Sequence, residues 1–258
     1  MHTKTPIKKL LVALRYLQTI FSRRDVLFSI AMLAALYGAW PAFEEAFTQP
    51  DFSQNWQQDC DLVLIHKGLV EHPRFRDTLE WWTGTWVGQV PFWRPLTSLL
   101  FWLEWKAFGW EFQDAWVLVH GLSHIAACAL LFLLAERLFG SPLVAFLSVY
   151  LWAGPRTGLY FLQSQAPVAS ALNGGWKNSP DVWLAVAVLG GLYLILARPI
   201  AGALVLATAP LFKETGFAAL AIGVAFAHVR YRAWKLTGLM VLTATFAAFA
   251  KLHATGLG

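Results

Sequence analysis

The chain has 258 residues, of which 57% are hydrophobic and 14% are charged, and its mean hydropathy is +0.51. This small number of polar side chains cannot cover the surface of a soluble globular protein. The composition therefore excludes a soluble globular protein and indicates an integral membrane protein. The formal net charge of +5 comes from basic residues dispersed between apolar runs, which excludes a nucleic-acid interface and favours a role in topology.

The first 24 residues contain six basic residues and no acidic one. Apolar residues from Ile7 to Phe21 recur at helical spacing, which predicts a basic amphipathic helix on the cytoplasmic membrane surface, with a solvated basic tail as the alternative. The membrane domain then covers residues 25–258. Its first span, Val26 to Phe43, is not expected to be a cleaved signal, because Glu44-Glu45 follows where small residues would be needed.

A long polar segment, residues 44–114, follows the first span. It carries 11 of the 15 acidic residues of the chain and only five lysines or arginines. The positive-inside rule therefore places this segment on the extracytoplasmic side, with the N-terminus in the cytoplasm. Because tryptophan favours the headgroup layer, the seven tryptophans from Trp81 to Trp110 predict short helices that lie along the membrane surface.

The remaining apolar runs predict further spans, each with its basic end in the cytoplasm. Residues 200–228 could form one helix with Lys213 and Glu214 at mid-membrane, or two short spans that meet at this pair near the outer face. The second interpretation is favoured, because Arg230 and its basic neighbours then lie in the cytoplasm and no charged pair is placed at the bilayer centre. The fold class is therefore an all-α membrane protein with about seven transmembrane helices, after Val26–Phe43: Ala115–Ala135, Pro142–Leu162 with an interruption at Gly154-Pro155, Val182–Ala197, the two short spans, and Leu236–Ala250.

Two groups of polar residues in the outer segment are candidates for chemistry. Asp59 and Asp61 lie two residues apart, and a carboxylate just above a membrane can act as a general base or hold a divalent cation. On spacing alone, solvated loop carboxylates without a functional role are the more common interpretation of such a pair. Arg94 begins an apolar helix, where it could bind a phosphate bidentately or serve as an interfacial anchor.

Other candidates lie in the spans. His120 and His124 share one helix face, which suits a metal, although packed bundle histidines are the more common reading of this pattern. Ionisable residues inside a membrane indicate function by default, so Lys213 and Glu214 are candidates, with an internal ion pair as the alternative. Lys177 and Asp181 lie one turn apart and could pair with each other or line a pocket.

These groups are expected to meet in one outward-facing cleft, and the stretches that carry them resemble the GT-C superfamily of membrane glycosyltransferases. The similarity lies closest to the O-mannosyltransferase-like members that carry tetratricopeptide repeats in larger proteins. It rests on Trp93-Arg94-Pro95-Leu96-Thr97-Ser98-Leu99 with Phe108-Gly109, on His124 with Glu136-Arg137-Leu138-Phe139-Gly140, and on Leu211-Phe212-Lys213-Glu214-Thr215 with Asp181 before it.

The resemblance implies transfer of a sugar, with inversion, from a polyprenyl-phosphate-linked donor to an acceptor on the extracytoplasmic face. It further implies Asp59 as the general base with Asp61 as second choice, and Arg94 and Lys213 as phosphate ligands. Glu214, His124, Lys177 and Asp181 are the other expected substrate-binding residues. The sequence leaves the cofactor open, with a divalent cation at the loop carboxylates as one candidate. The chain resembles the N-terminal seven-helix module alone of a longer enzyme.

Two alternatives to an enzyme remain open. A catalytically inactive subunit would keep the fold and bind other membrane proteins through the tryptophan-rich segment. A small transporter or lipid-binding protein would use the interrupted spans as a midplane site, but the sequence lacks the inverted repeat expected of a transporter. In each case we expect membrane lipids as partners, no nucleic acid, and the inner (plasma) membrane of a bacterial cell as the location.

Overall fold

The protein is all-helical in the part that the computed structural model describes, namely residues 19, 23–48, 60–87, 92–110, 113–153, 179–231 and 234–255, with no strand among them. The amphipathic helix expected in residues 1–24, the catalytic candidate Asp59, Lys177 and the Gly154-Pro155 interruption lie outside these residues. Asp61 lies in a described helix, but its side chain does not belong to the described part.

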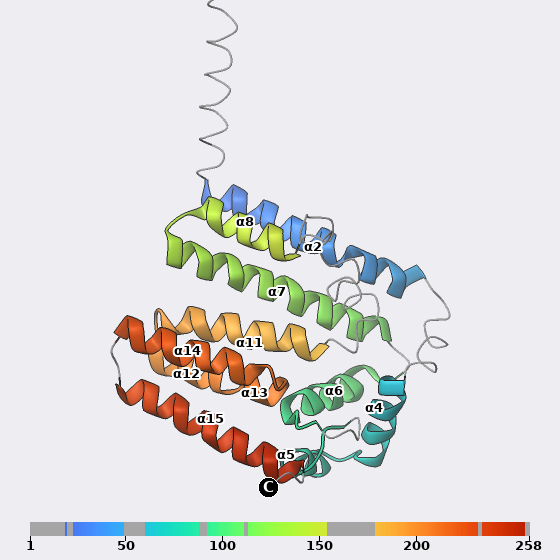
Figure 1. Ribbon diagram of the computed structural model, residues 1–258. Coiled ribbons are helices and arrows are strands. Elements are labelled where there is room, and N and C mark those ends of the chain that lie inside the picture. The colour runs from blue at the N-terminus through green and yellow to red at the C-terminus, as the bar shows by residue number, and fades with distance from the viewer. Residues whose placement is uncertain are drawn as a thin grey trace, which may run out of the picture.

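Long apolar helices stand side by side and form the body of the molecule (Figure 1). They match the predicted runs in order, and α2, α7 and α15 extend beyond the apolar stretches at both ends. The helices are α2 (Arg24–Thr48), α7 (Gln113–Phe139), α8 (Pro142–Ala153), α11 (Ser179–Ile195), α12 (Pro199–Ala207) continued by α13 (Ala209–Phe212), α14 (Gly216–Tyr231) and α15 (Trp234–Ala254).

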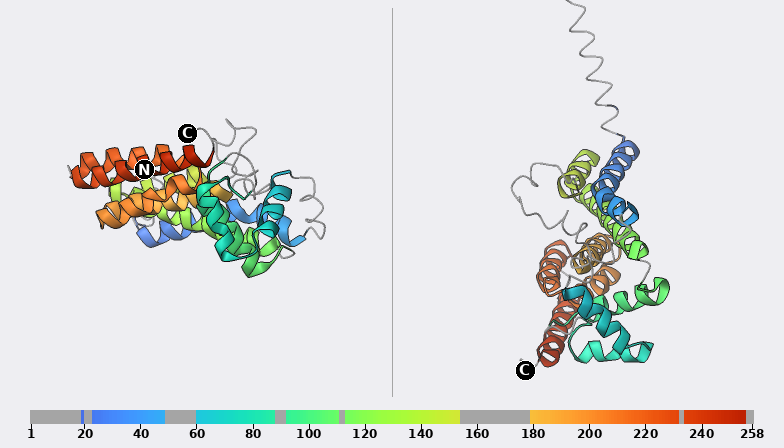
Figure 2. Two further views of the ribbon diagram at one scale, coloured as in Figure 1. Left: turned by 90° about the horizontal axis from the view of Figure 1, so that it is seen from below. Right: turned by 90° about the vertical axis from the view of Figure 1, so that its right-hand side faces the viewer.

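The polar segment folds into short helices, as its tryptophans predict. They are α4 (Cys60–Glu71), the 3-10 turn η1 (Phe75–Leu79), α5 (Glu80–Thr83) and α6 (Pro95–Phe108). Figure 1 and the view from below in Figure 2 place these elements together at one end of the long helices. We call this group the helical cap.

Helix α6 shows how the local sequence sets an element's bounds. Pro95 opens the helix, where its missing N–H has no intrahelical acceptor to lose, and Gly109 ends it with a φ of +73° that favours glycine.

The cap is held together by tight contacts: the indole N–H of Trp102 donates to the carbonyl of His72 at 3.1 Å. A Cβ on Gly68 would meet the backbone of Val87, so the α4 backbone packs directly on the segment before α6.

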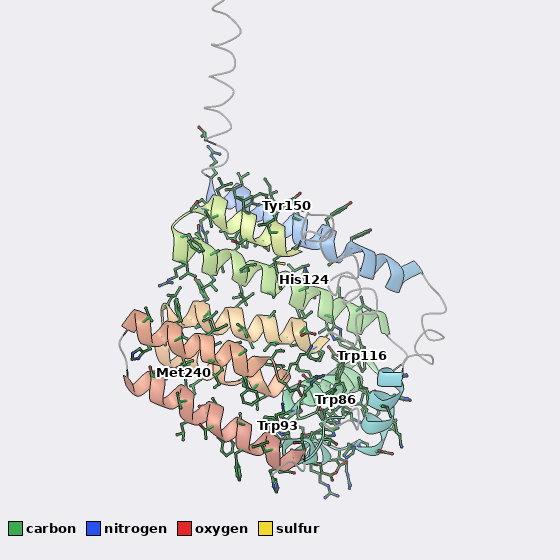
Figure 3. The ribbon with its side chains drawn as sticks, viewed as in Figure 1. Trp86, Trp93, Trp116, His124, Tyr150 and Met240 are labelled. Atoms are coloured by element: carbon green, nitrogen blue, oxygen red, sulfur yellow. The ribbon has the colours of Figure 1, made fainter. Side chains whose placement is uncertain are left out.

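Three clusters of buried side chains hold the molecule together. The first joins the cap to α7 and α11 through Phe101, Trp116 and Trp183, and the second packs α2, α7 and α8 around Phe132. The third packs α11, α12, α14 and α15 around Leu206 and Met240. Figure 3 shows Trp86 and Trp116 at the cap end and Met240 far from them, so the aromatic cluster is where cap and long helices meet.

The end opposite the cap is basic. Arg24 at the start of α2 pairs with Glu136 near the end of α7 at 2.9 Å, and Arg137 donates to the carbonyl of Leu196 at 3.1 Å. Arg198 lies immediately before α12. The arginines that the sequence assigns to one side of a bilayer therefore lie at one end of the helices, and the helical cap lies at the other.

The question left open for residues 200–228 is answered by a helical hairpin. Helices α12 and α13 end at Phe212, a turn follows at Lys213 and Glu214, and α14 returns from Gly216. The interpretation as two helices is confirmed. One helix in the described part, Ala115–Phe139 within α7, is long and apolar enough to cross a membrane by length and composition.

Candidate functional site

Four charged residues that are distant in sequence meet at the cap end of the long helices. Arg94 precedes α6, Asp181 lies in the first turn of α11, and Lys213 and Glu214 form the turn between α13 and α14. They form two ion pairs, Arg94 with Glu214 and Lys213 with Asp181. We call these four residues the charged quartet.

The Arg94–Glu214 pair is the more buried of the two. The Nη2 and Nε of Arg94 lie 2.8 and 3.1 Å from the same carboxylate oxygen, and the two side chains are 11% and 23% exposed. The guanidinium also lies over the rings of Phe92 and Trp86, with centroid distances of 4.4 and 5.2 Å. A planar cation between a carboxylate and two aromatic faces is held in one orientation.

The Lys213–Asp181 pair is more open. The ammonium lies 2.7 Å from both carboxylate oxygens, and the side chains of Lys213 and Asp181 are 25% and 43% exposed. The Lys177–Asp181 pairing considered from the sequence is not tested, since Lys177 lies outside the described residues. Asp181 is bound by Lys213 of the α13–α14 turn, and the Lys213 ammonium is the more accessible of the two cations.

Short polar contacts fix the turn that carries half of the quartet. The hydroxyl of Thr97 donates to the carbonyl of Phe212 at 2.7 Å, which joins the first turn of α6 to the end of α13. A Cβ on Gly216 would collide with the backbone of Ala209 and Pro210, so α13 and α14 approach more closely there than another residue allows. Thus Lys213 and Glu214 are held in place from both sides.

A buried donor lies beside Arg94. The indole nitrogen of Trp86 is buried and finds no hydrogen-bond acceptor among the residues that the structure describes. A buried N–H normally has an acceptor, because its desolvation costs free energy. The side chain thus adds a neutral donor next to the guanidinium.

The two histidines of α7 do not share a ligand. The Nε2 of His120 lies 3.1 Å from a carboxylate oxygen of Glu104, and both side chains are almost fully buried. His124 stacks on Trp152 at 5.4 Å and lies 3.6 Å from the sulfur of Cys128. Within the described residues, no group of three or more His, Cys, Asp or Glu side chains could hold a metal ion.

Sequence reasoning missed Glu104. No acid was expected near His120, but Glu104 reaches it from α6 across 16 residues. A signal was present, because Glu104 is the single acidic residue in the largely apolar helix Pro95–Phe108. A lone acid in an apolar helix indicates a buried partner.

The quartet thus brings together four of the eight residues predicted from the sequence, and His124 lies apart from them along α7 (Figure 3). Of the other three, Asp59 and Lys177 and the side chain of Asp61 fall outside the described part. No protein-family model, curated protein or solved structure matches the chain.

Proposed function

We propose that the protein is an integral membrane glycosyltransferase of the GT-C type that takes its sugar from a polyprenyl-phosphate-linked donor on the extracytoplasmic face. The observation that carries this proposal is the charged quartet, in which two cations lie at the tryptophan-rich end of an apolar helical bundle. Fixed cations at such a position would stabilise the negative charge that develops on a leaving phosphate.

Exposed apolar side chains support the membrane part of the proposal. Leu33, Ile200, Val229 and Phe246 are 64–80% exposed, and they lie on four different helices. Extensive apolar surface on a soluble monomer is rare, and a bilayer would cover it. The basic end formed by Arg24 and its neighbours is then cytoplasmic, and the cap is extracytoplasmic.

The two cations are assigned different roles. The bidentate contact of Arg94 with Glu214, and its two aromatic neighbours, leave little of the guanidinium for a ligand, so Arg94 positions the turn. Lys213 is the phosphate ligand, because its ammonium is more exposed and can exchange a carboxylate for a phosphate oxygen. Trp86 supplies a neighbouring N–H donor. The first-loop acid Asp59 remains the proposed general base, with Asp61 as second choice.

The test is sugar transfer by the full chain in phospholipid vesicles. The donor is mannosyl or glucosyl polyprenyl phosphate with a labelled sugar, and the acceptor is the hydroxyl group of a water-soluble compound or of water itself. Transfer leaves polyprenyl phosphate behind, and the signal is label that leaves the lipid fraction. Removal of one fixed group that stabilises developing charge costs about 10²–10³ in rate, so Lys213→Ala should lose activity on that scale. Asp59→Asn should abolish transfer.

Lys106→Ala is the matched control. Lys106 lies in the cap with its ammonium 4.0 Å from the ring centroid of Trp105, outside the quartet, and its removal should leave transfer unchanged. If the wild-type protein releases no label from either donor, or if Lys213→Ala and Lys106→Ala behave alike, the catalytic proposal fails.

A second candidate is an inactive GT-C-like subunit that binds other membrane proteins. The specific observation in its favour is that each cation of the quartet is paired with an acid of the same chain, as in a purely structural site. Purification from the native membrane would then yield a stoichiometric partner protein and no sugar transfer.

A further inference from the structure

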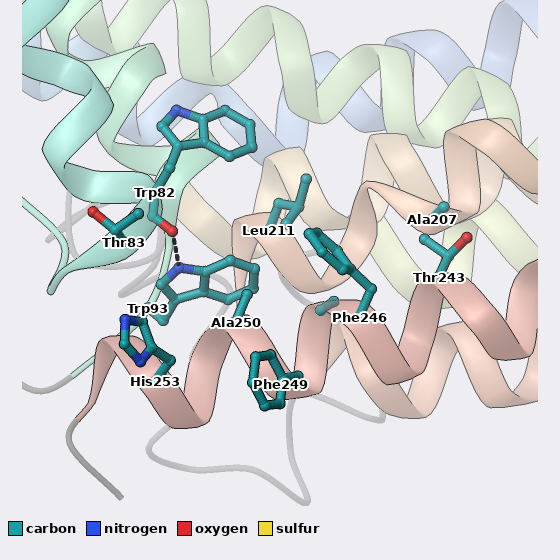
Figure 4. Close-up of a pocket in the computed structure, with 11 residues that line it drawn as sticks. Trp82, Thr83, Trp93, Ala207, Leu211, Thr243, Phe246, Phe249, Ala250 and His253 are labelled. Carbon is teal, nitrogen blue, oxygen red and sulfur yellow. Dashed lines mark hydrogen bonds between the residues drawn. The ribbon is translucent and has the colours of Figure 1, made fainter. Parts of the chain in front are cut away.

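An apolar cavity of about 440 Å³ lies beside the quartet, between α5, the segment before α6, α12–α13 and α15 (Figure 4). Its volume is within the range of roughly 300–1,000 Å³ that small-molecule sites have. The cavity does not belong to the quartet, since none of the four charged residues lines it. Trp93 and Leu211, which do line it, are close neighbours in sequence of Arg94 and Lys213.

The cavity is elongated. Its α15 side runs from Thr243 to His253 along one face of the helix, a distance of about 15 Å at 1.5 Å per residue. Ala247 and Ala250 on this face have small side chains, which leave the space open. A long, narrow cavity suits an extended chain better than a compact ligand.

The lining offers almost no hydrogen bonds to a ligand. The indole N–H of Trp93 already donates to the carbonyl of Trp82 at 3.1 Å, as Figure 4 shows. The hydroxyl of Thr83 and the imidazole of His253 lie together at one end, next to Trp93, while Thr243 and Ala207 lie at the other. An occupant therefore has a hydrocarbon body and a polar group at the end near His253.

The surroundings of the cavity indicate where such an occupant comes from. On α15, Leu242, Phe246 and Phe249 are 68–72% exposed, and Phe246 and Phe249 also line the cavity. In a bilayer this face of α15 contacts lipid, so the cavity is continuous with the hydrocarbon layer. Lys251 and His253 in the last turn of α15 complement a negative headgroup.

We infer that this cavity is a binding site for one acyl chain of an anionic membrane phospholipid, with the phosphate group near His253. The inference rests on the membrane location within the proposed function and does not depend on sugar transfer. A lipid held there fills the space between α15 and the cap. Retention depends on packing contacts, because lipid tails are as apolar as the lining and no hydrophobic gain is available.

The test uses the full chain in vesicles that contain phosphatidylglycerol with a diazirine in one acyl chain. After irradiation and digestion, the labelled peptides are mapped by mass spectrometry. We expect label concentrated on residues 243–253 and around Trp93, and its loss in Ala250→Phe, which fills the cavity from α15. Ala207→Leu blocks the same space from α12 and should give the same loss.

Leu242→Trp is the matched control, because it adds an aromatic ring to an exposed position of α15 that does not line the cavity. Its labelling should equal that of the wild-type protein, and thermal unfolding in detergent verifies that each variant is folded. Label spread evenly over α14 and α15, unchanged by both blocking variants, overturns the inference.

Two further outcomes also overturn it and separate it from the proposed function. If a diazirine-bearing polyprenyl phosphate labels residues 243–253 and the phospholipid does not, the occupant is wrong while the transferase proposal stands. If the protein does not sediment with vesicles, the membrane location fails and both proposals fail with it. Specific labelling without any sugar transfer would support the lipid site and contradict the enzyme.

Discussion

The ammonium of Lys213 lies 2.7 Å from both carboxylate oxygens of Asp181, across 32 residues of sequence, while the adjacent Glu214 binds Arg94 across 120 residues. One turn therefore ties α11 to the segment before α6 through two neighbouring side chains of opposite charge. The two pairs differ in exposure, and this difference allows their roles to be separated by experiment.

Neutralising Asp181 should strengthen the binding of an anion at Lys213. The pair is exposed enough that its loss costs no more than about 1 kcal/mol of stability, so Asp181→Asn should remain folded. In this variant a phosphate no longer has to displace the Asp181 carboxylate from Lys213. The free energy of up to about 1 kcal/mol that this saves predicts up to about fivefold tighter binding of polyprenyl phosphate. Quenching of tryptophan fluorescence measures the affinity. Weaker binding in both Asp181→Asn and Lys213→Ala would mean that Asp181 contacts the ligand itself.

Breaking the Arg94–Glu214 pair should destabilise the protein more strongly. Removal of one partner from a buried pair costs roughly 3–5 kcal/mol, and the partial exposure of Glu214 predicts about 2–3 kcal/mol for Arg94→Met. The double variant Arg94→Met/Glu214→Gln should recover part of that loss, because no unpaired charge remains. A urea-unfolding double-mutant cycle in micelles gives the coupling. Strictly additive effects would contradict a direct interaction.

The Glu104–His120 pair should behave as a unit that joins the cap to α7. Each side chain is at most 7% exposed, so either single replacement by leucine leaves a buried polar partner, at a cost of about 1–3 kcal/mol. Replacing both by leucine should cost less than the sum. Thermal unfolding of the two single variants and the double variant tests this. If His120→Leu alone is neutral, the pair is not a link.

His66 should make stability depend on pH. It stacks on Trp110 at 4.3 Å, and burial lowers its pKa below the usual 6.5. The unfolded chain then binds the proton first, so stability is full above about pH 6.5 and falls as the pH drops toward the lower folded pKa. Unfolding of the wild-type protein and of His66→Gln between about pH 7.5 and pH 5 isolates this contribution. Equal pH slopes in both proteins would contradict it.

Gly216→Ala should disturb the quartet without touching a charge. The added Cβ collides with the backbone of Ala209 and Pro210, which cannot move aside as a flexible side chain would, so α13 and α14 must separate. We expect a loss of about 1–3 kcal/mol and weaker phosphate binding. Gly238→Ala, which meets open space on α15, is the control and should stabilise the protein by up to about 1 kcal/mol, because alanine favours a helix over glycine. Equal stability of the two variants would contradict the close approach.

Much of the fold follows from apolar periodicity and charge. The helices appear where the apolar runs predict them, and the hairpin at Lys213 was correctly favoured because a long helix would have buried two charges. The bounds were less accurate: α2 continues to Thr48, beyond Phe43 and through Glu44-Glu45. An apolar run shows which part of a helix is shielded from water. Polar residues beyond the run also form the backbone hydrogen bonds of a helix, so the helix extends past the run.

The site was predicted only as a set of residues. Arg94, Asp181, Lys213 and Glu214 were expected in one place, and they lie together. Which cation binds which acid could not be deduced, because pairing between residues so far apart is set by helix packing. Glu104 was missed for the same reason, since its partner lies on another helix.

The charged quartet contains two positive and two negative side chains, so it is electrically neutral as a whole when all four are ionised. A dianionic phosphate that binds Lys213 would leave the site with a net charge of about −2 unless a compensating charge arrives with it. Entry of a divalent cation would restore neutrality. Affinity for the phosphate should therefore rise as the concentration of a divalent cation increases, and charge balance becomes the property that controls when the site is filled.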